Sequence, residues 1–278
     1  LQQELEEAVS FHAPLWATLL QFEQARNFGS LIVPKLRNPA ETLRFVEAQD
    51  FGGDLLLKEV QERVVAVLRM AEALSPKYHV VVANPPYMGG KGMNPKLGEF
   101  AKEQYPDTKS DLFAMFMERS LRLAIKNGMM AMINMQAWMF LSSFKKLRGK
   151  LLSNSTLLSM AHLGERAFDT IGGAVVSTTA FVFAKAYMPQ HKGEYVRLVD
   201  GSSESEKATA ILQAVRKRDC GLLYRASSDD FAQIPGNPIA YWLSENLIKS
   251  FATNLKLAEF CPGSFGMSAG DPSIIHQW

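Results

Sequence analysis

A short run of β-branched and small residues, Tyr78 to Ala83, lies between two stretches that have helical spacing. The run is too short for a stable helix and is apolar on both faces, which is typical of a strand buried inside a parallel sheet. The stretch before it, from Asp54 to Leu74, repeats apolar residues every three or four positions, and the stretch from Ser110 or Asp111 to Lys126 does the same. This helix–strand–helix order favours an α/β fold.

The alternation continues along the chain. Residues 129–133, 157–162 and 174–184 are strand candidates, and residues 142–152 form a basic helix candidate. We therefore predict a doubly wound, Rossmann-like α/β sheet. Nearer the start, residues 4–26 and a segment that begins at Asn38 are expected to be helical, and residues 31–33 to be a short strand.

The composition narrows the class of protein. The 278 residues are 47% hydrophobic and 21% charged, which is the profile of a folded globular chain. Lysine and arginine (30) nearly balance aspartate and glutamate (28), so nucleic acid binding would depend on local patches. The chain has only two cysteines, and it shows neither a signal peptide nor an apolar run of about 20 residues, which indicates a cytoplasmic location. The five histidines lack ligand spacing, and we assign no metal.

The motif Asn84-Pro85-Pro86-Tyr87 comes directly after the first predicted strand. In a doubly wound sheet, ligands bind at the carboxyl ends of strands, so these residues stand where a site is expected. The Asn84 side-chain oxygen and the Pro85 carbonyl can each accept one N–H of a planar amine, and both prolines hold the backbone rigid. Two such acceptors stabilise positive charge on the nitrogen as it attacks an electrophile, while Tyr87 offers an aromatic face for stacking. The competing interpretation is a proline-rich turn that only ends a strand.

These four residues resemble motif IV, the catalytic motif of the N6-adenine DNA methyltransferases, and the order of the later segments resembles the gamma class. Ser110 to Phe113, with Phe116, resembles motif V; Gly128 to Trp138 resembles motif VI; and Glu165 to Lys185 resembles motif VIII.

The resemblance implies roles for particular residues. Asn84, Pro85, Pro86 and Tyr87 would be catalytic, and S-adenosylmethionine would be the methyl donor. Asp111 and Phe113 would line the cofactor side, while Phe168 would close on a flipped adenine opposite Tyr87. For Phe168 the alternative is simple packing in the core.

The flanking segments narrow the resemblance to PglX, the methyltransferase family of BREX phage-defence systems. They are Asn27 to Ile32, Phe231 to Trp242 and Gly266 to Trp278. This family implies double-stranded DNA as substrate and other BREX proteins as partners. It also implies two parts: residues 1–195 as the catalytic methyltransferase domain with motifs IV to VIII, and residues 196–278 as the start of an α+β target-recognition domain.

One departure from the family concerns the cofactor loop. The S-adenosylmethionine-binding motif I is a strand and a glycine-rich turn upstream of motif IV, and nothing in residues 1–83 matches it. The run Gly89 to Gly92 lies on the wrong side of motif IV, where it is either a mobile loop beside the base pocket or a surface turn. We therefore expect the chain to be a fragment that lacks motif I and is inactive by itself.

Two alternative functions remain open. A protein glutamine N5-methyltransferase would present the same planar amine to the same four residues. A DNA-binding adaptor with a vestigial motif IV would bind DNA without S-adenosylmethionine. Two basic clusters could neutralise phosphates, although the interpretation as ordinary solvated faces is slightly favoured; they are Lys145, Lys146, Arg148 and Lys150, and then Arg216 to Arg218.

Overall fold

The computed structural model describes residues 13–76, 78–169, 176–188 and 190–253. Its centre is a six-stranded mixed sheet in the order β1-β2-β4-β3-β5-β6. The strands are β1 (Tyr78–Ala83), β2 (Ala124–Met135), β3 (Thr156–Gly164), β4 (Thr178–Ala184), β5 (Lys192–Arg197) and β6 (Leu223–Ser227). Because β4 is antiparallel to both β2 and β3, the strands β1, β2, β3 and β5 all run in one direction. The predicted α/β class is confirmed.

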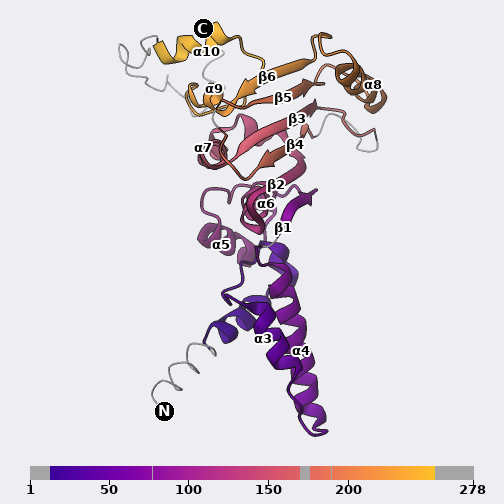
Figure 1. The fold of residues 1–278 in the computed structure, drawn as a ribbon, viewed down its shortest axis with the longest axis vertical. Helices are drawn as coiled ribbons and strands as arrows, with labels where there is room; N and C mark the ends of the chain where they lie inside the picture. The colour runs from indigo at the N-terminus through magenta and orange to yellow at the C-terminus, as the bar shows by residue number, and fades with distance from the viewer. Residues whose placement is uncertain (1–12, 77, 170–175, 189, 254–278) are drawn as a thin grey trace, which may run out of the picture.

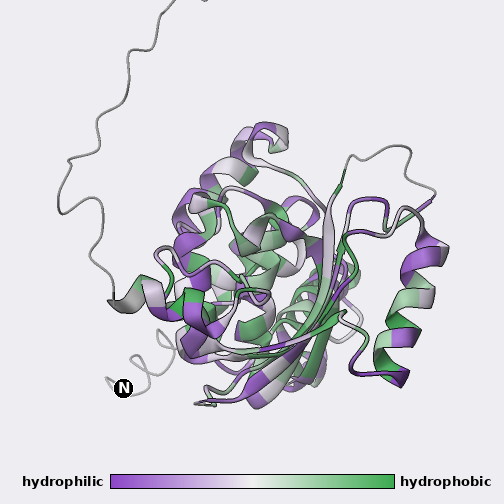
Figure 2. Cartoon of the chain, turned by 90° about the horizontal axis from the view of Figure 1, so that it is seen from above, coloured by the Kyte–Doolittle hydropathy of each residue, from purple (hydrophilic) through white to green (hydrophobic). Residues whose placement is uncertain are grey.

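Helices cover the two faces of the sheet unequally. On one face, α6 (Leu112–Leu123), α7 (Lys145–Asn154) and α9 (Ser228–Ala232) enclose the main core together with Met130, Phe183 and Trp138. On the other face stands α8 (Glu204–Arg216), and Figure 2 shows it by itself on that side. Beside α8 runs a groove of about 660 Å³, whose lining includes Val82, Ala131 and Val182.

The first predicted strand has the expected bounds but not the expected burial. Val80 is 55% exposed and Val82 is 73% exposed, because both side chains project from the face that α8 covers only in part, where Val82 lines the groove. The prediction of a strand buried on both faces is therefore wrong for the described part of the chain.

The segment before β1 is helical and extends away from the sheet (Figure 1). Residues 13–22 are helical, followed by α2 (Ala25–Phe28), the 3₁₀ turn η1 (Gly29–Leu31), α3 (Pro39–Glu47) and α4 (Leu55–Ala73). As predicted, Asp54 caps α4, its side chain accepting from the amides of Leu56 and Leu57. The strand predicted at residues 31–33 is wrong, because a 3₁₀ turn and irregular backbone occupy this position.

The helix predicted to run to Lys126 ends early. α6 stops at Leu123 and β2 begins at Ala124 without a connecting loop. Asn127, with a φ of 64°, breaks the regular strand geometry, and the register of β1 against β2 shifts nearby, between Tyr78 and Val80. The glycine run forms another 3₁₀ turn, η2 (Gly90–Gly92), before α5 (Pro95–Gln104).

The sheet continues beyond the predicted domain boundary. Residue 195 lies inside β5, and β6 pairs with β5 to extend the same sheet. A final helix, α10 (Glu245–Thr253), ends the described part of the chain. The division into 1–195 and 196–278 stays a prediction. No helix within the described ranges is both long and apolar enough to cross a membrane.

Candidate active site

The loop after β1 presents two unused acceptors. Asn84 is exposed and lines one end of the groove, whereas Pro85 is buried. No described residue donates a hydrogen bond to the Asn84 side chain or to the Pro85 carbonyl. The two groups that the motif offers to an incoming amine are therefore adjacent and unpaired within the described chain.

Tyr87 is held against the core at the start of α6. Its ring stands edge-on to that of Phe113, with centroids 6.3 Å apart and planes at 87°, and Phe113 in turn packs on Phe144 at 5.4 Å. Partial burial raises the pKa of Tyr87 above its ordinary value, so the phenol stays protonated at neutral pH. A neutral, half-buried ring of this kind suits stacking on a planar group.

Asp111 ties the loop to α6. Its Oδ1 accepts from the Phe113 amide at 3.2 Å, as the N-cap of the helix, and from the Met88 amide at 3.1 Å. The Met88 carbonyl accepts from the Leu112 amide at 3.0 Å, and Gly89 forms an antiparallel bridge with Asp111. The residues directly after Tyr87 are thus fixed to the first turn of α6.

For the methyl transfer that the resemblance to motif IV implies, we expect Asp111→Ala to lower kcat about 10- to 100-fold, because the loop loses its side-chain acceptor and a displacement of about 1 Å can cost this much. Asp111→Asn, which keeps Oδ1, should retain most of the activity. Asp54→Ala is the matched control, since it removes an aspartate cap far from the loop. Steady-state kinetics measure the difference. Equal losses of kcat in Asp111→Ala and Asp54→Ala would contradict the inference that Asp111 positions the loop after Tyr87.

Phe168 lies in the connection between β3 and β4 and is half-buried. Because β1 and β3 run in the same direction, this connection leaves the sheet at the same edge as Asn84. No ring contact joins Phe168 to Tyr87 in the described part of the chain, and residues 170–175 of the motif VIII segment lie outside it. The role of Phe168 in closing on a base stays a prediction.

The two residues assigned to the cofactor offer it only one free polar atom within the described chain. The Phe113 ring is 1% exposed and is covered by Tyr87 and Phe144. Asp111 already uses Oδ1 for two backbone amides, which leaves only Oδ2 for a bound ligand. With Phe113 covered and a single Asp111 oxygen left, these two residues do not by themselves fit S-adenosylmethionine. The cofactor role of Asp111 and Phe113 stays a prediction.

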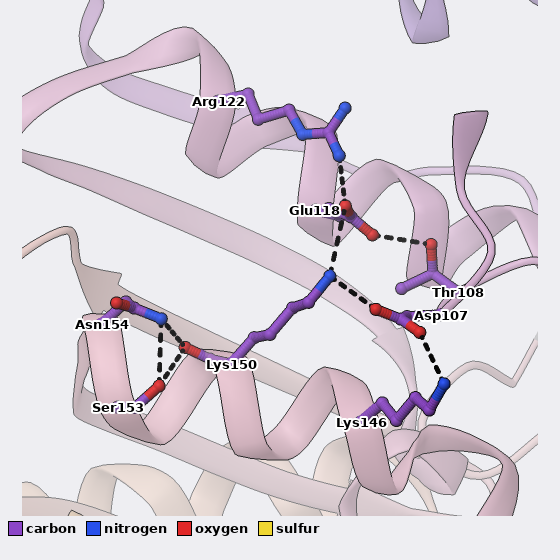
Figure 3. A network of polar contacts seen from close by, with 8 residues as sticks. All are labelled: Asp107, Thr108, Glu118, Arg122, Lys146, Lys150, Ser153 and Asn154. Carbon is purple, nitrogen blue, oxygen red and sulfur yellow. Dashed lines mark hydrogen bonds and ion pairs between the residues drawn. The ribbon is translucent and has the colours of Figure 1, made fainter.

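The basic cluster on α7 is engaged in ion pairs and core contacts. Lys150 Nζ lies 2.6 Å from Asp107 Oδ2, and Lys146 Nζ lies 3.2 Å from Asp107 Oδ1 (Figure 3). These two lysines hold the pKa of Asp107 below its usual range. Glu118 joins the same network through Lys150, whose Nζ lies 4.0 Å from Glu118 Oε1, and it also contacts Arg122 and Thr108. In the second cluster, Arg218 pairs with Glu194 at 2.8 Å. These partners occupy Lys146, Lys150 and Arg218, whereas Lys145, Arg216 and Lys217 are exposed without such a partner among the described residues, as on an ordinary solvated face.

Arg148, the fourth basic residue of the α7 cluster, is 2% exposed. Its Nη1 donates to the carbonyls of Trp138 and Leu141, each at 2.8 Å. Its Nε and Nη2 donate to the Gly236 carbonyl at 3.1 and 2.8 Å. Arg148 therefore joins the segment of Trp138 and Leu141 to the segment of Gly236 by hydrogen bonds, and its guanidinium is not available to bind a phosphate.

Sequence reasoning also missed a buried polar bridge at this edge of the sheet. His162 on β3 contacts the Tyr241 hydroxyl through Nδ1 at 2.9 Å and Gln136 Oε1 through Nε2 at 2.6 Å. Burial lowers the pKa of His162 to about 4, with smaller contributions from Arg197 and Lys207. His162 is thus neutral at physiological pH. Residues 136, 162 and 241 are far apart in the sequence, and no regular spacing indicates that they are in contact. Within the described ranges, no group of three His, Cys, Asp or Glu side chains is placed to hold a metal.

Because His162 is neutral in the folded chain, we predict that the free energy of unfolding decreases at acidic pH. The unfolded chain, with an ordinary histidine pKa near 6.5, binds a proton before the folded chain does, so stability falls as the pH drops from about 6.5 towards 4. The loss should reach about 3 kcal/mol, on the order of the free energy of this pKa difference. Thermal unfolding measured from pH 7.5 to 4.5 tests it, and His162→Gln should flatten this part of the profile. An unchanged slope in His162→Gln would mean that other groups control acid stability.

The fold and the loop define the class of protein. The model of the Eco57I restriction-modification methylase family matches residues 22–168, and the chain belongs to this family. More particularly, it is 45% identical over 240 residues to the adenine-specific methyltransferase BrxX of Escherichia coli O9:H4 (strain HS), covering 85% of this chain and 19% of that protein. It is also 44% identical over 214 residues to the adenine-specific methyltransferase PglX of Lacticaseibacillus casei (strain Zhang), covering 76% of this chain and 18% of the relative. The resemblance drawn from the motifs is confirmed.

The chain spans about a fifth of the length of these relatives. Among solved structures, it is similar to a nuclease-deletion mutant of the type ISP restriction-modification enzyme LlaGI, in complex with a DNA substrate mimic. The TM-score is 0.46 at 14% identity, over 75% of this chain and 18% of that one.

Proposed function

We propose that this chain forms the base-binding half of an adenine-specific DNA methyltransferase, which acts on N6 of an adenine flipped out of double-stranded DNA. The observation that carries the proposal is the pair of unpaired acceptors, Asn84 Oδ1 and the Pro85 carbonyl, on a rigid loop at the end of a parallel strand. Membership of the restriction-modification methylase family and the relatives named as adenine-specific methyltransferases support it.

The chain's own residues would hold the amine and would not supply a base that abstracts its proton. Asn84 and Pro85 would each accept one N–H of the planar N6 amine, which draws the nitrogen towards tetrahedral geometry and stabilises the charge that develops on it. Tyr87, with its neutral ring braced by Phe113, would stack on the purine. The nitrogen loses its proton easily once it has been methylated, so no strong base is required of these residues.

S-adenosylmethionine, when bound, would supply an electrophilic sulfonium methyl group. The resemblance would place Asp111 and Phe113 on the cofactor side, and the part of Asp111 that remains available there is Oδ2, since Oδ1 accepts from the Met88 and Phe113 amides. Phe168 would cover the second face of the base. We further propose that residues 1–195 belong to the catalytic domain, that residues 196–278 begin a target-recognition domain, and that the protein works with other BREX proteins in the cytoplasm against phage DNA.

Transfer of a labelled methyl group tests the function. A protein of full length that carries this sequence is incubated with methyl-labelled S-adenosylmethionine, DNA and a protein extract. We expect the label to appear in DNA and to elute as N6-methyladenine after digestion. Label in protein glutamine would support the glutamine methyltransferase instead. DNA binding without any label or S-adenosylmethionine affinity would support the adaptor.

A further inference from the structure

Two aromatic rings that the proposed chemistry does not use are exposed side by side. Phe140 is 36% exposed and Trp242 is 38% exposed, and their ring centroids lie 5.7 Å apart. The neighbouring Leu141 is 53% exposed. We name Phe140, Leu141 and Trp242 the aromatic surface. Its residues come from two segments about 100 positions apart in the sequence, one after β2 and one after α9.

The two backbone segments that support the aromatic surface are joined by hydrogen bonds. Arg148 joins the turn that carries Phe140 and Leu141 to the turn at Gly236 through four hydrogen bonds. The Ile239 amide donates to the Met139 carbonyl at 3.0 Å, which joins the same two segments again.

The bridge from Gln136 through His162 to Tyr241 passes under both rings. The His162 ring lies 6.2 Å from those of both Phe140 and Trp242, and Tyr241 stands edge-on to Trp242 at 5.0 Å. Exposed aromatic side chains whose rotamers are locked from below are typical of a preorganised binding surface.

The aromatic surface lies at the same edge of the sheet as Asn84. Gln136 comes directly after the carboxyl end of β2, and His162 is near the carboxyl end of β3. β1 and β3 are three strand spacings apart, so Asn84 and the His162 end of β3, against which the two rings lie, are separated by roughly 14 Å along this edge. A DNA duplex held at Asn84 would therefore reach both sites.

We propose that Phe140 and Trp242 form a stacking surface for a nucleobase of the bound DNA other than the flipped adenine. This inference rests on the proposed function. The dimensions favour a base over a protein partner, since three partly exposed side chains offer on the order of 250 Å², whereas a stable protein interface takes about 800 Å² from each partner. The two rings that contact Phe140 or Trp242 from below, those of His162 and Tyr241, carry no charge at neutral pH, and stacking on aromatic rings accepts any base.

Fluorescence of 2-aminopurine tests the proposal in a full-length methyltransferase that carries this sequence. The DNA duplexes contain the sequence that the enzyme methylates, in unmethylated form, with 2-aminopurine at successive positions around the target adenine. The Kd for DNA, the KM for DNA and kcat are all measured at one salt concentration. We expect Trp242→Ala to raise Kd and KM for DNA on the order of tenfold. It should also abolish the quenching of 2-aminopurine fluorescence that the wild type shows at one position outside the target base. The kcat at saturating DNA should stay within about twofold of wild type. Trp242→Phe should retain most of the affinity and the quenching.

Phe140→Ala repeats the test from the second segment. Phe51→Ala is the matched control, because Phe51 is also 38% exposed but lies between α3 and α4, far from the sheet edge. Equal Kd values for wild type, Trp242→Ala and Phe140→Ala would overturn the proposal, as would an equal loss in Phe51→Ala. Unchanged DNA binding together with loss of a protein partner would overturn it in favour of a protein-docking surface. If the wild type labels no DNA at all, the proposed function fails first, and the two failures are thereby distinguished.

Discussion

Replacing Asn84 with alanine should lower kcat for adenine methylation by at least about 100-fold while leaving the Kd for DNA within about threefold. The side-chain oxygen is one of the two acceptors to which the proposed function assigns the amine, and no described residue donates a hydrogen bond to it. Its interaction grows as charge develops on the nitrogen, so its loss affects the transition state more than the bound ground state. Single-turnover methylation with saturating S-adenosylmethionine measures the chemical step, and a binding assay on the same duplex measures Kd.

The control for Asn84→Ala is Asn154→Ala. Asn154 is also an exposed asparagine, but it lies at the end of α7, where its amide donates to the Lys150 carbonyl. Asn154→Ala should methylate DNA at the wild-type rate. Asn84→Asp keeps an acceptor oxygen and should fall between the two. Near wild-type methylation by Asn84→Ala would remove the basis of the proposed function, because the two acceptors are its central observation.

The location of the candidate site could be predicted because its signals are local. The run Tyr78 to Ala83 is a strand with the expected bounds, and the catalytic motif comes directly after it, so one short window contains both the strand and the loop. The start of α6 could be placed at Ser110 or Asp111 for the same reason, and the structure shows that Asp111 is the cap. Its second bond, to Met88, joins residues 23 positions apart and has no such signal.

The burial of the strand could not be predicted from the same window. A β-branched run records strand propensity and apolarity, but not whether helices cover both faces of the sheet at that strand. For Val80 and Val82, the missing information was that α8 covers their face only in part.

The buried arginines were missed because their partners are backbone carbonyls. Arg148 stands among lysines and resembles one of a solvated basic row, yet its acceptors include Gly236, 88 positions away. Carbonyl oxygens leave no trace in the sequence, because every residue has one. The same is true of Arg119, whose partners lie between 45 and 89 positions away.

Arg119→Met should release the segment before α3 from α6. Arg119 is 1% exposed; its Nε donates to the Ser30 carbonyl at 2.9 Å, and its Nη2 donates to Ile32 at 2.8 Å and Leu74 at 2.6 Å. Methionine fills a similar volume but leaves three carbonyls without this donor, and we expect a local loss of about 3 to 5 kcal/mol. Hydrogen exchange of the amides in residues 29–36 should accelerate more than about 100-fold.

Arg69→Met is the matched control for Arg119→Met, because Arg69 is an exposed arginine on α4 that pairs with Glu47 at 2.8 Å. An exposed pair contributes about 1 kcal/mol or less, so exchange in residues 29–36 should stay near the wild-type rate. Tyr105→Phe adds an independent test, since the Tyr105 hydroxyl donates to the Leu31 carbonyl at 2.6 Å within the same segment and its removal should give a smaller acceleration. If Arg119→Met exchanged no faster than Arg69→Met, packing alone would hold the segment, and the guanidinium would not be the group that fixes it to the helix beneath the candidate active site.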